Sequence, residues 1–469
     1  MSSVGITSAR QDWSAESIRR WLGVILLAAF ALRLAALWVT QPTGLVNDEY
    51  SYFTLAKQFA LGADIADADG RAPGVVFFYA ALMRVFGASA DVARLGNVVL
   101  STASVWLVYS LGRRFASTLV GLGAAAIVAC YPGLIGFSHS LWSETLYVFL
   151  ELGALLLLAT HRDGNVWLRL AGAGLLFGMG ALTREVGLIV AVFCAGSLVY
   201  EGWPHWKTGV AKAALTLAAC MVVVLPWSAH LKATTGHSVL ITGNTWFNLY
   251  IASVGEKMVN GQKTHPWNGY QLLGDTRSER ETAARPIALR AVWNQMPLWP
   301  IKKLREFNNL LAPTSFVVKR LRTAADDEGS ATLFVLGKWR YVFKLAVLDG
   351  PLVREGFALL TMATYVAVLL LGVAGLLLTC RSGAGQLLPL FLAFILGHVL
   401  PPLVTFALTR FRLPLMPIMA IGAASLLQML WAEGRGVWGA RSQARRYGAA
   451  IAVCGATVAI VGGYLTSVA

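Results

Sequence analysis

The chain carries a series of apolar runs, each of about the length that crosses a lipid bilayer as a helix. A bilayer core of about 30 Å needs roughly 20 helical residues. Because a lipid-exposed backbone must satisfy its own hydrogen bonds, such runs span the bilayer as helices. The sequence therefore predicts an all-α, polytopic membrane protein with about eleven transmembrane helices, at 21–40, 93–111, 117–136, 144–160, 168–183, 186–200, 210–227, 357–379, 386–408, 413–431 and 448–466.

Composition supports a membrane protein. Of the 469 residues, 57% are hydrophobic and only 13% are charged, whereas soluble proteins carry about a quarter charged residues. The net charge of +15 is expected to serve anionic lipid head groups and cytoplasmic anchoring, and it is a poor argument for nucleic acid. The five cysteines lie in or at the end of apolar runs without metal-type spacing, so we expect small apolar side chains.

Basic residues in short loops predict the orientation. The run 74–86 has only 13 residues and contains Arg84, so we expect a helix lying at the membrane interface rather than a span. With that assignment the positive-inside rule holds for every basic short loop, and the N-terminus is cytoplasmic and the C-terminus outside. The basic residues that then share the cytoplasmic side are Arg19, Arg20, Arg113, Arg114, Arg162, Lys207, Arg381, Arg435, Arg441, Arg445 and Arg446.

This topology divides the chain into four parts. They are a cytoplasmic N-terminus at 1–20, a transmembrane catalytic module at 21–227 with its first outer loop at 41–92, an extracytoplasmic segment at 228–356, and C-terminal transmembrane helices at 357–469. The extracytoplasmic segment begins with a strand-like stretch, "HSVLITGNTWFNLYIAS", and continues with amphipathic basic stretches such as "IKKLREFNNLL". It is the only part large enough to form a small extramembrane unit.

Carboxylates stand where apolar runs reach the outer side. Asp48 and Glu49 follow the first run, and Glu144 opens another. An ionisable group at this position is costly unless it faces a cavity or a partner. Two outward-facing acidic sites suit a general base, and Asp48 and Glu144 are candidate ligands for a divalent cation such as Mg²⁺, Mn²⁺ or Zn²⁺. The alternative is that Asp48 or Glu49 only caps the helix that begins near Tyr50.

Four arginines fall on the same outer side, against the positive-inside expectation. They are Arg71, Arg184, Arg410 and Arg412. The guanidinium group suits phosphate oxygens in a forked geometry, so a lipid phosphate presented from the outer leaflet would account for them. The alternative is that each pairs with a neighbouring acid, as Arg184 with Glu185, or extends to lipid head groups.

Other polar residues in the apolar runs are weaker signals. Arg33 and Glu151 are candidates to neutralise each other inside the bundle, and we expect His398 to be a helix–helix hydrogen-bonding residue. No nucleotide-binding or hydrolase motif is present, so soluble nucleotide chemistry has no support. The aromatic residues near the outer edge suit either a stacked sugar or an interfacial belt; they are Trp142, Trp227, Trp246, Phe247 and Trp267.

The order of several short motifs carries a family resemblance. After the first span come "NDEYSYFTLAKQFA", "RAPGVVFFYAALMRVFG", "ARLGNVVLSTASVWLVYSLGRRF", "HSLWSETLYVFL", "GLLFGMGALTREVG" and finally "TRFRLPLMPIMAIGAASLL". This succession resembles the GT-C superfamily of integral-membrane glycosyltransferases. It is most similar to the bacterial relatives of protein O-mannosyltransferases and of the lipid A aminoarabinose transferase (glycosyltransferase families 39 and 83), from about residue 20 to about residue 430.

The resemblance implies a GT-C fold with juxtamembrane helices in the first outer loop. It implies that Asp48, with Glu49 beside it, is the catalytic carboxylate and that Glu144 is the second acidic position. No second acid stands beside Glu144, unlike the D-x-E pair of oligosaccharyltransferases, which puts metal binding of their kind in doubt. Basic positions of the family correspond to Arg71, Arg410 and Arg412.

With these residues, the resemblance implies transfer of a sugar from a polyprenyl-phosphate donor, of undecaprenyl-phosphate type, to an acceptor hydroxyl or phosphate. The reaction would occur at the outer face of a bacterial inner membrane, with a glycan, a lipid or a protein as acceptor. Asp48 would be the base, Glu144 would position the acceptor or a cation, and the arginines would hold the phosphate. Partial burial is expected to raise the pKa of Asp48 toward the working pH.

Two other functions remain open from the sequence. A transporter or flippase of a lipid-linked sugar would also need outward arginines and charges inside the membrane. Such proteins usually show inverted repeats or paired broken helices, and neither is visible in the sequence. A polysaccharide polymerase or ligase would differ by using a diphosphate-linked glycan donor.

Overall fold

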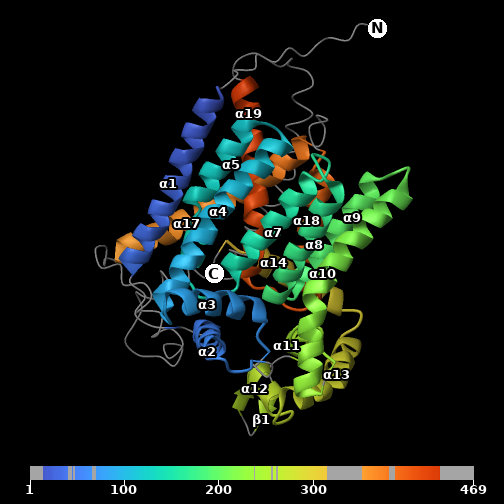
Figure 1. The fold of residues 1–469 in the computed structure, drawn as a ribbon. Coiled ribbons are helices and arrows are strands. Elements are labelled where there is room, and N and C mark those ends of the chain that lie inside the picture. The colour runs from blue at the N-terminus through green and yellow to red at the C-terminus, as the bar shows by residue number, and fades with distance from the viewer. Residues whose placement is uncertain are drawn as a thin grey trace.

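The structure is a computed structural model of the chain, and it describes residues 14–40, 45, 48–65, 70–236, 238–254, 257–259, 262–313, 351–379 and 386–433. Almost all regular structure in these ranges is helical (Figure 1). The one sheet within them is a pair of three-residue antiparallel strands, β1 (Lys257–Val259) and β2 (Gln262–Thr264). The prediction of an all-α polytopic membrane protein is confirmed.

The helices follow the chain in two sets. Those of the N-terminal half are α1 (Ala15–Thr40), α2 (Asp48–Ala60), α3 (Pro73–Phe86), α4 (Ala90–Phe115), α5 (Thr118–Cys130), α6 (Pro132–Phe137), α7 (Glu144–Ala159), α8 (Val166–Thr183), α9 (Val186–Glu201) and α10 (Trp206–Thr235). The later ones are α11 (Thr245–Val254), α12 (Pro266–Gln271), α13 (Arg277–Asn294), α14 (Trp299–Leu311), α17 (Pro351–Thr379), α18 (Leu388–Val404), the 3₁₀ helix η1 (Thr409–Leu415) and α19 (Met416–Glu433).

Most of the predicted spans that the structure describes are single helices, but the run predicted at 117–136 is divided between α5 and α6 at Tyr131. Within the described ranges, six helices are long and apolar enough to cross a membrane: α1, α4, α8, α10, α17 and η1 with α19. Shorter apolar helices, among them α5, α9 and α18, occupy other predicted runs. The run at 448–466 and the basic residues at 381 and 435–446 lie outside the described residues. The count of eleven spans therefore stays a prediction.

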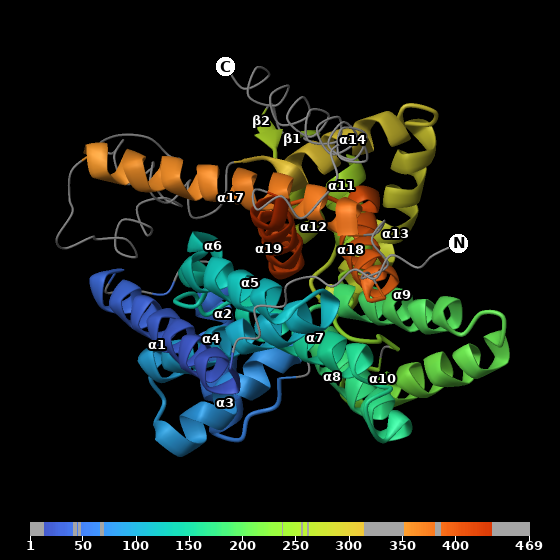
Figure 2. The same cartoon turned by 90° about the horizontal axis from the view of Figure 1, so that it is seen from above.

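Small residues let the bundle helices approach closely, as is common between membrane helices. A Cβ added at Gly375 of α17 would lie 1.8 Å from the carbonyl oxygen of Gly422 in α19. A Cβ at Gly174 of α8 would lie 2.1 Å from the carbonyl oxygen of Thr216 in α10. Seen from above, α19 lies against α17 and α8 lies beside α10 (Figure 2). These two pairs of helices therefore pack backbone to backbone.

The helix predicted at the membrane interface is α3. It lies across the foot of the bundle, beside α2, and crosswise to α1 and α4 (Figure 1). Pro73 is at its first turn, where a missing N–H is tolerated. Gly87 ends it with a φ of 98°, a conformation that favours glycine. The segment predicted to be the first outer loop thus contains two short helices, as the resemblance implied.

The strand predicted at the start of the extracytoplasmic segment is wrong for residues 245–254, which form α11. The cause is a tertiary contact. Glu281 of α13 accepts hydrogen bonds from the backbone N–H groups of Trp246 at 3.0 Å and Phe247 at 2.9 Å. These bonds satisfy N–H groups that the first turn of a helix leaves free. Residues 314–350 of the same segment lie outside the described residues.

The intramembrane pair suggested for Arg33 and Glu151 does not form. The guanidinium of Arg33 donates to the Ser101 hydroxyl at 2.7 Å and to the carbonyl oxygens of Ala29 and Ala129 at 3.0 and 3.1 Å. Arg33 is fully buried, and these bonds pin α1 to α4 and to the end of α5. Arg33 is therefore a structural residue of the bundle.

Candidate active site

Asp48 is the first residue of α2 and lies between two arginines from distant parts of the chain. Its Oδ1 is 2.9 Å from Nη2 of Arg71, which precedes α3. Its Oδ2 is 3.0 Å from Nη1 of Arg410 in η1. The segment between α1 and α4 and the turn before α19 therefore meet at this carboxylate.

Glu144 is the first residue of α7 and continues the same cluster. Its Oε1 lies 2.6 Å from Nη1 of Arg184 and 3.7 Å from Nε of Arg410. The Glu144 side chain is only 2% exposed. Five side chains thus form a row of alternating charge, in the order Arg71, Asp48, Arg410, Glu144 and Arg184. We call this row the charge row.

Aromatic rings hold the guanidinium groups of the charge row. The guanidinium carbon of Arg410 lies 4.7 Å from the centre of the Trp142 ring, and that of Arg184 lies 5.2 Å from the centre of the Phe411 ring. Arg71 lies 5.5 Å from the ring centre of Tyr52. Such cation–π contacts orient the arginines as well as stabilise them.

The charge row lines a cavity of about 440 Å³. Oε2 of Glu144 and Nε of Arg410 are buried and form no hydrogen bond with any described residue. A buried polar atom without a partner is costly in a folded protein. One acceptor and one donor of the charge row are therefore free to bind a polar ligand that enters the cavity.

The pKa of Asp48 is lowered, so the prediction of a raised pKa is wrong. Burial alone would raise it, and burial is the largest single influence. The charges and hydrogen bonds of Arg71 and Arg410 together outweigh burial and hold the pKa below the ordinary 3.8. In this state Asp48 is ionised and a weak base. Glu185 behaves in the opposite way, because burial raises its pKa and outweighs a hydrogen bond from Thr242.

Two predicted site residues do not join the charge row. Glu49 is buried on the other side of α2, where its Oε1 accepts a hydrogen bond from the backbone N–H of Leu141 at 2.9 Å. Arg412 donates to the carbonyl oxygens of Leu310, at 3.1 Å, and Ala312. Its guanidinium carbon lies 3.6 Å from the centre of the Tyr365 ring. Two residues along a 3₁₀ helix point in different directions, so Arg410 and Arg412 face different neighbours.

Arg277, the first residue of α13, also lines the cavity. Its guanidinium packs against Gly70, which has a φ of +66°. A Cβ at Gly70 would lie 2.0 Å from the guanidinium carbon. Nδ2 of Asn244 donates to the Gly70 carbonyl oxygen at 2.6 Å. No sequence motif points to Arg277, because only the fold brings α13 close to the loop that contains Gly70.

His398 and several of the outer aromatic residues also reach the cavity. Nε2 of His398 lies 3.0 Å from the Tyr147 hydroxyl, which confirms the predicted helix–helix hydrogen bond. Trp142, Phe247 and Trp267 line the cavity with them. Trp227 and Trp246, which the sequence grouped with these rings, line a neighbouring cavity instead.

The residues present do not fit a divalent cation at Asp48 and Glu144. The guanidinium of Arg410 lies between the two carboxylates, where such a cation would have to bind. The described ranges contain no group of three His, Cys, Asp or Glu residues arranged to hold a metal. We therefore assign no step of the chemistry to a metal at this pair.

Solved structures of other proteins have a similar fold. The archaeal oligosaccharyltransferase AglB from Archaeoglobus fulgidus, in complex with an inhibitory peptide and a dolichol-phosphate, aligns with a TM-score of 0.50 and 14% identity, over 95% of this chain and 55% of that one. Its apo form gives a TM-score of 0.50 and 15% identity over 96% and 55%. Identity at this level shows the fold alone. The chain therefore has the GT-C fold that the resemblance implied.

Sequence comparisons identify a family model and curated relatives that are similar to this chain. The family model for dolichyl-phosphate-mannose-protein mannosyltransferases matches residues 70–230. The undecaprenyl phosphate-α-4-amino-4-deoxy-L-arabinose arabinosyl transferase of Pseudomonas aeruginosa strain UCBPP-PA14 is 26% identical over 331 residues, which cover 62% of this chain and 55% of the relative. That of strain LESB58 is 26% identical over 286 residues, or 54% and 50%. The chain spans about half the length of the curated relatives it matches.

Proposed function

We propose that this protein transfers a sugar from a polyprenyl-phosphate donor to an acceptor hydroxyl at the charge row. The observation that carries the proposal is the position of Arg410, which contacts the carboxylates of both Asp48 and Glu144 inside one cavity. The relatives named for undecaprenyl-phosphate chemistry support the choice of donor.

The charge balance of the cavity supports a donor with a single phosphate. Four guanidinium groups line it, from Arg71, Arg184, Arg277 and Arg410, against three carboxylates, from Asp48, Glu144 and Glu185. The difference of four and three leaves one positive charge when all are ionised. A polyprenyl-phosphate sugar is a phosphodiester and carries one negative charge, which this balance accommodates. A diphosphate-linked glycan carries two, so the balance favours a transferase over the polymerase or ligase alternative.

Binding of the donor would convert Asp48 into a working base. The phosphate would compete with Asp48 for the guanidinium groups of Arg71 and Arg410, which are the groups that lower its pKa. When those contacts loosen, burial dominates and the pKa of Asp48 rises. A base with a higher pKa takes a proton more readily near neutral pH. Asp48 would therefore become active only when a donor occupies the cavity.

The reaction then follows from the arrangement. The acceptor oxygen forms a bond to the anomeric carbon and gives its proton to Asp48, while the bond from that carbon to the phosphate oxygen breaks. The electron pair of the broken bond stays on the phosphate, which leaves as polyprenyl monophosphate. Arg410 and Arg184 stabilise the charge that develops there. Glu144 keeps those two arginines in place, since it contacts both.

A reconstituted assay tests the proposal. The purified protein is placed in proteoliposomes with a panel of undecaprenyl-phosphate sugars and an extract of cell-envelope acceptors, and free undecaprenyl monophosphate is measured. The proposal predicts its release, dependent on acceptor, from at least one donor. Movement of intact donor between leaflets without release would indicate a flippase. Turnover of diphosphate-linked donors alone would indicate a polymerase or ligase, and either result would contradict the proposal.

We also infer that the cavity opens to the outside of the bacterial inner membrane. The support is the positive-inside rule, because the basic loop residues Arg113, Arg114 and Arg162 line a separate cavity formed by other helix ends. An Asp275→Cys variant and a Thr208→Cys variant, treated in intact spheroplasts with a membrane-impermeant maleimide, test this orientation. Labelling at 275 and not at 208 is expected. The reverse pattern would contradict the inferred orientation.

A further inference from the structure

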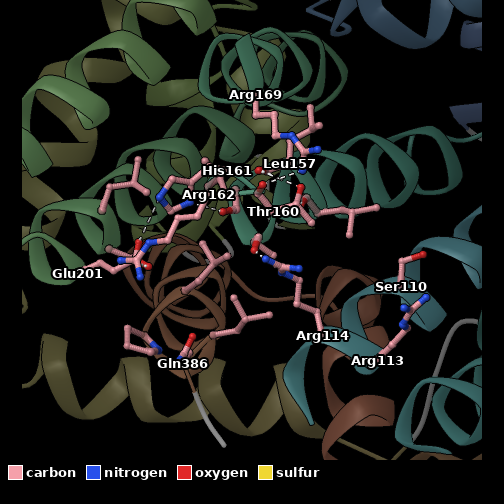
Figure 3. Close-up of a pocket in the computed structure, with 18 of the residues that line it drawn as sticks. Ser110, Arg113, Arg114, Leu157, Thr160, His161, Arg162, Arg169, Glu201 and Gln386 are labelled. Atoms are coloured by element: carbon pink, nitrogen blue, oxygen red, sulfur yellow. Dashed lines mark hydrogen bonds and ion pairs between the residues drawn. The ribbon is translucent and has the colours of Figure 1, made fainter. Parts of the chain in front are cut away.

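A second cavity, of about 1050 Å³, lies at the other end of the bundle. The helix α7 connects the two ends, because Glu144 at its start is in the charge row and Ala159 at its end lines this cavity. Its 16 residues correspond to a length of about 24 Å. The second cavity is therefore separate from the candidate active site, and its lining is shown in Figure 3.

Four arginines line this cavity, and helix ends hold two of them in place. Nε of Arg114 donates to the Ala159 carbonyl oxygen at 2.7 Å, and Nη1 of Arg169 donates to the Thr160 carbonyl oxygen at 2.7 Å. These are the carbonyl groups that the end of α7 leaves without a helical partner. Figure 3 shows both side chains beside the loop that contains Thr160 and His161. The two guanidinium groups are thus fixed at the wall of the cavity.

Positive charges outnumber negative charges at this cavity. Arg114 pairs with Asp163, and Nη2 of Arg162 pairs with Oε1 of Glu201 at 2.8 Å. Arg169 has no carboxylate partner within the described ranges, and Arg113 forms neither a hydrogen bond nor an ion pair with any residue described there. Four guanidinium groups against these two carboxylates leave two positive charges. Leu387, which precedes α18, and Pro389 in its first turn line the same space, and this helix start adds a weak attraction for anions.

Another part of the cavity wall is apolar. Trp106 of α4, Leu157 of α7, Leu198 of α9 and Leu390 of α18 face it. A soluble anion would bind the arginines and leave these side chains in water. A molecule with a phosphate at one end and hydrocarbon at the other would cover both parts of the lining, so the lining is complementary to an amphiphile.

We propose that this second cavity binds an anionic phospholipid from the surrounding bilayer. Its phosphate would contact Arg113 and Arg169, and its acyl chains would lie along Leu157, Leu198 and Leu390. Basic pockets between membrane helices are suited to such head groups. The bound lipid would hold the ends of α4, α7, α9 and α18 together. This proposal does not depend on the sugar-transfer reaction, because no residue of the charge row takes part.

Native mass spectrometry of the purified, full-length protein in a mild detergent tests the proposal. Phosphatidylglycerol, phosphatidylcholine with the same acyl chains, and inorganic phosphate are added separately, and retained adducts are counted. Retention of phosphatidylglycerol and not of phosphatidylcholine is expected. The variant Arg113→Ala is expected to weaken retention about tenfold, the effect of about 1.4 kcal/mol. Arg169→Gln is a second variant, and Arg20→Ala, which removes an exposed arginine near the start of α1, is the matched control.

Three outcomes would overturn the proposal. Equal retention of the two lipids would show that the head group does not contribute to binding. Unchanged retention in both arginine variants would show that the lipid does not bind in this cavity. Displacement of phosphatidylglycerol by inorganic phosphate alone would show a site for a free anion instead of a lipid. The Arg113 side chain is exposed and forms no hydrogen bond or ion pair with any described residue, so we expect Arg113→Ala to fold. The melting temperature of each variant without added lipid checks this directly.

Discussion

Nη1 of Arg410 lies 3.0 Å from Oδ2 of Asp48, although 362 positions separate the two residues in the chain. This contact closes the candidate site, because it joins the first outer loop to the turn before α19. The same guanidinium reaches Glu144 through Nε.

The variant Arg410→Lys is expected to lose most sugar transfer. A lysine keeps the charge but has a single ammonium group, which cannot contact Asp48 and Glu144 in the forked geometry of the arginine. Loss of one group that stabilises the leaving charge lowers kcat by about 10²–10³. The release of polyprenyl monophosphate measures the effect, with Arg290→Lys on the exposed side of α13 as the matched control. Normal turnover in Arg410→Lys would show that transfer does not require the forked contact of Arg410 with Asp48 and Glu144.

The variant Arg412→Ala is expected to affect stability and not catalysis. It removes the hydrogen bonds to the Leu310 and Ala312 carbonyl oxygens and the stacking on Tyr365. The loss lowers the free energy of unfolding by about 2 kcal/mol or more. Thermal unfolding in detergent measures it, and Arg290→Ala is the surface control. A folded Arg412→Ala protein with strongly reduced turnover would place Arg412 in the site after all.

The two outer carboxyl groups are expected to give opposite dependences of stability on pH. The pKa of Asp48 is lowered in the folded protein, so its contribution is present above its ordinary pKa of 3.8 and is lost as the pH falls through the folded value. The pKa of Glu185 is raised, so its contribution is present below its ordinary 4.5 and is lost as the pH rises through the folded value. Melting temperatures of Asp48→Asn and Glu185→Gln between pH 3 and pH 7 separate the two. A parallel shift of both variants would contradict the assigned directions.

The variant Gly70→Ala is expected to disturb the site through Arg277. The residue has a positive φ, and a left-handed conformation costs a non-glycine residue about 1–2 kcal/mol. In addition, the new methyl group would displace the Arg277 guanidinium from the cavity. Gly62→Ala is the matched control, since Gly62 also has a positive φ of +94° but nothing lies within 4 Å of its Cβ position. Both variants should lose stability, and only Gly70→Ala should also lose transfer. Equal transfer in the two would show that Arg277 has no role.

Chelation of divalent cations is expected to leave transfer unchanged. The reason is the guanidinium of Arg410, which lies between the carboxylates of Asp48 and Glu144. Turnover is measured after dialysis against EDTA and after addition of Mg²⁺, Mn²⁺ or Zn²⁺. A loss of turnover that one of these ions restores would show that Arg410 moves and that the two acids bind a metal.

Hydropathy and loop charge predicted most of the helices, the short helix α3 and the grouping of Asp48, Glu144, Arg71, Arg184 and Arg410. These features depend on local composition and on which side of a membrane a loop emerges, and both are visible in a sequence. The membrane therefore restricts the arrangement of this chain before any tertiary contact is known.

The predictions that were wrong concern features that depend on tertiary contacts. The stretch at 245–254 is rich in aromatic and β-branched residues, but Glu281 caps it as a helix. Arg412 lies two residues from Arg410, and only the 3₁₀ turn sends the two side chains to different neighbours. The pKa of Asp48 depends on two arginines whose distance from it no spacing could give.

The most direct measurement is polyprenyl monophosphate release by Asp48→Asn in proteoliposomes, beside Asp275→Asn as an exposed control. The substitution keeps the size of the side chain and removes its ability to take a proton. We expect Asp48→Asn to be folded and to bind the donor, but to release no polyprenyl monophosphate above background, while Asp275→Asn matches the unaltered protein. Release by Asp48→Asn at a rate close to that of the unaltered protein would contradict the role of this carboxylate as the base.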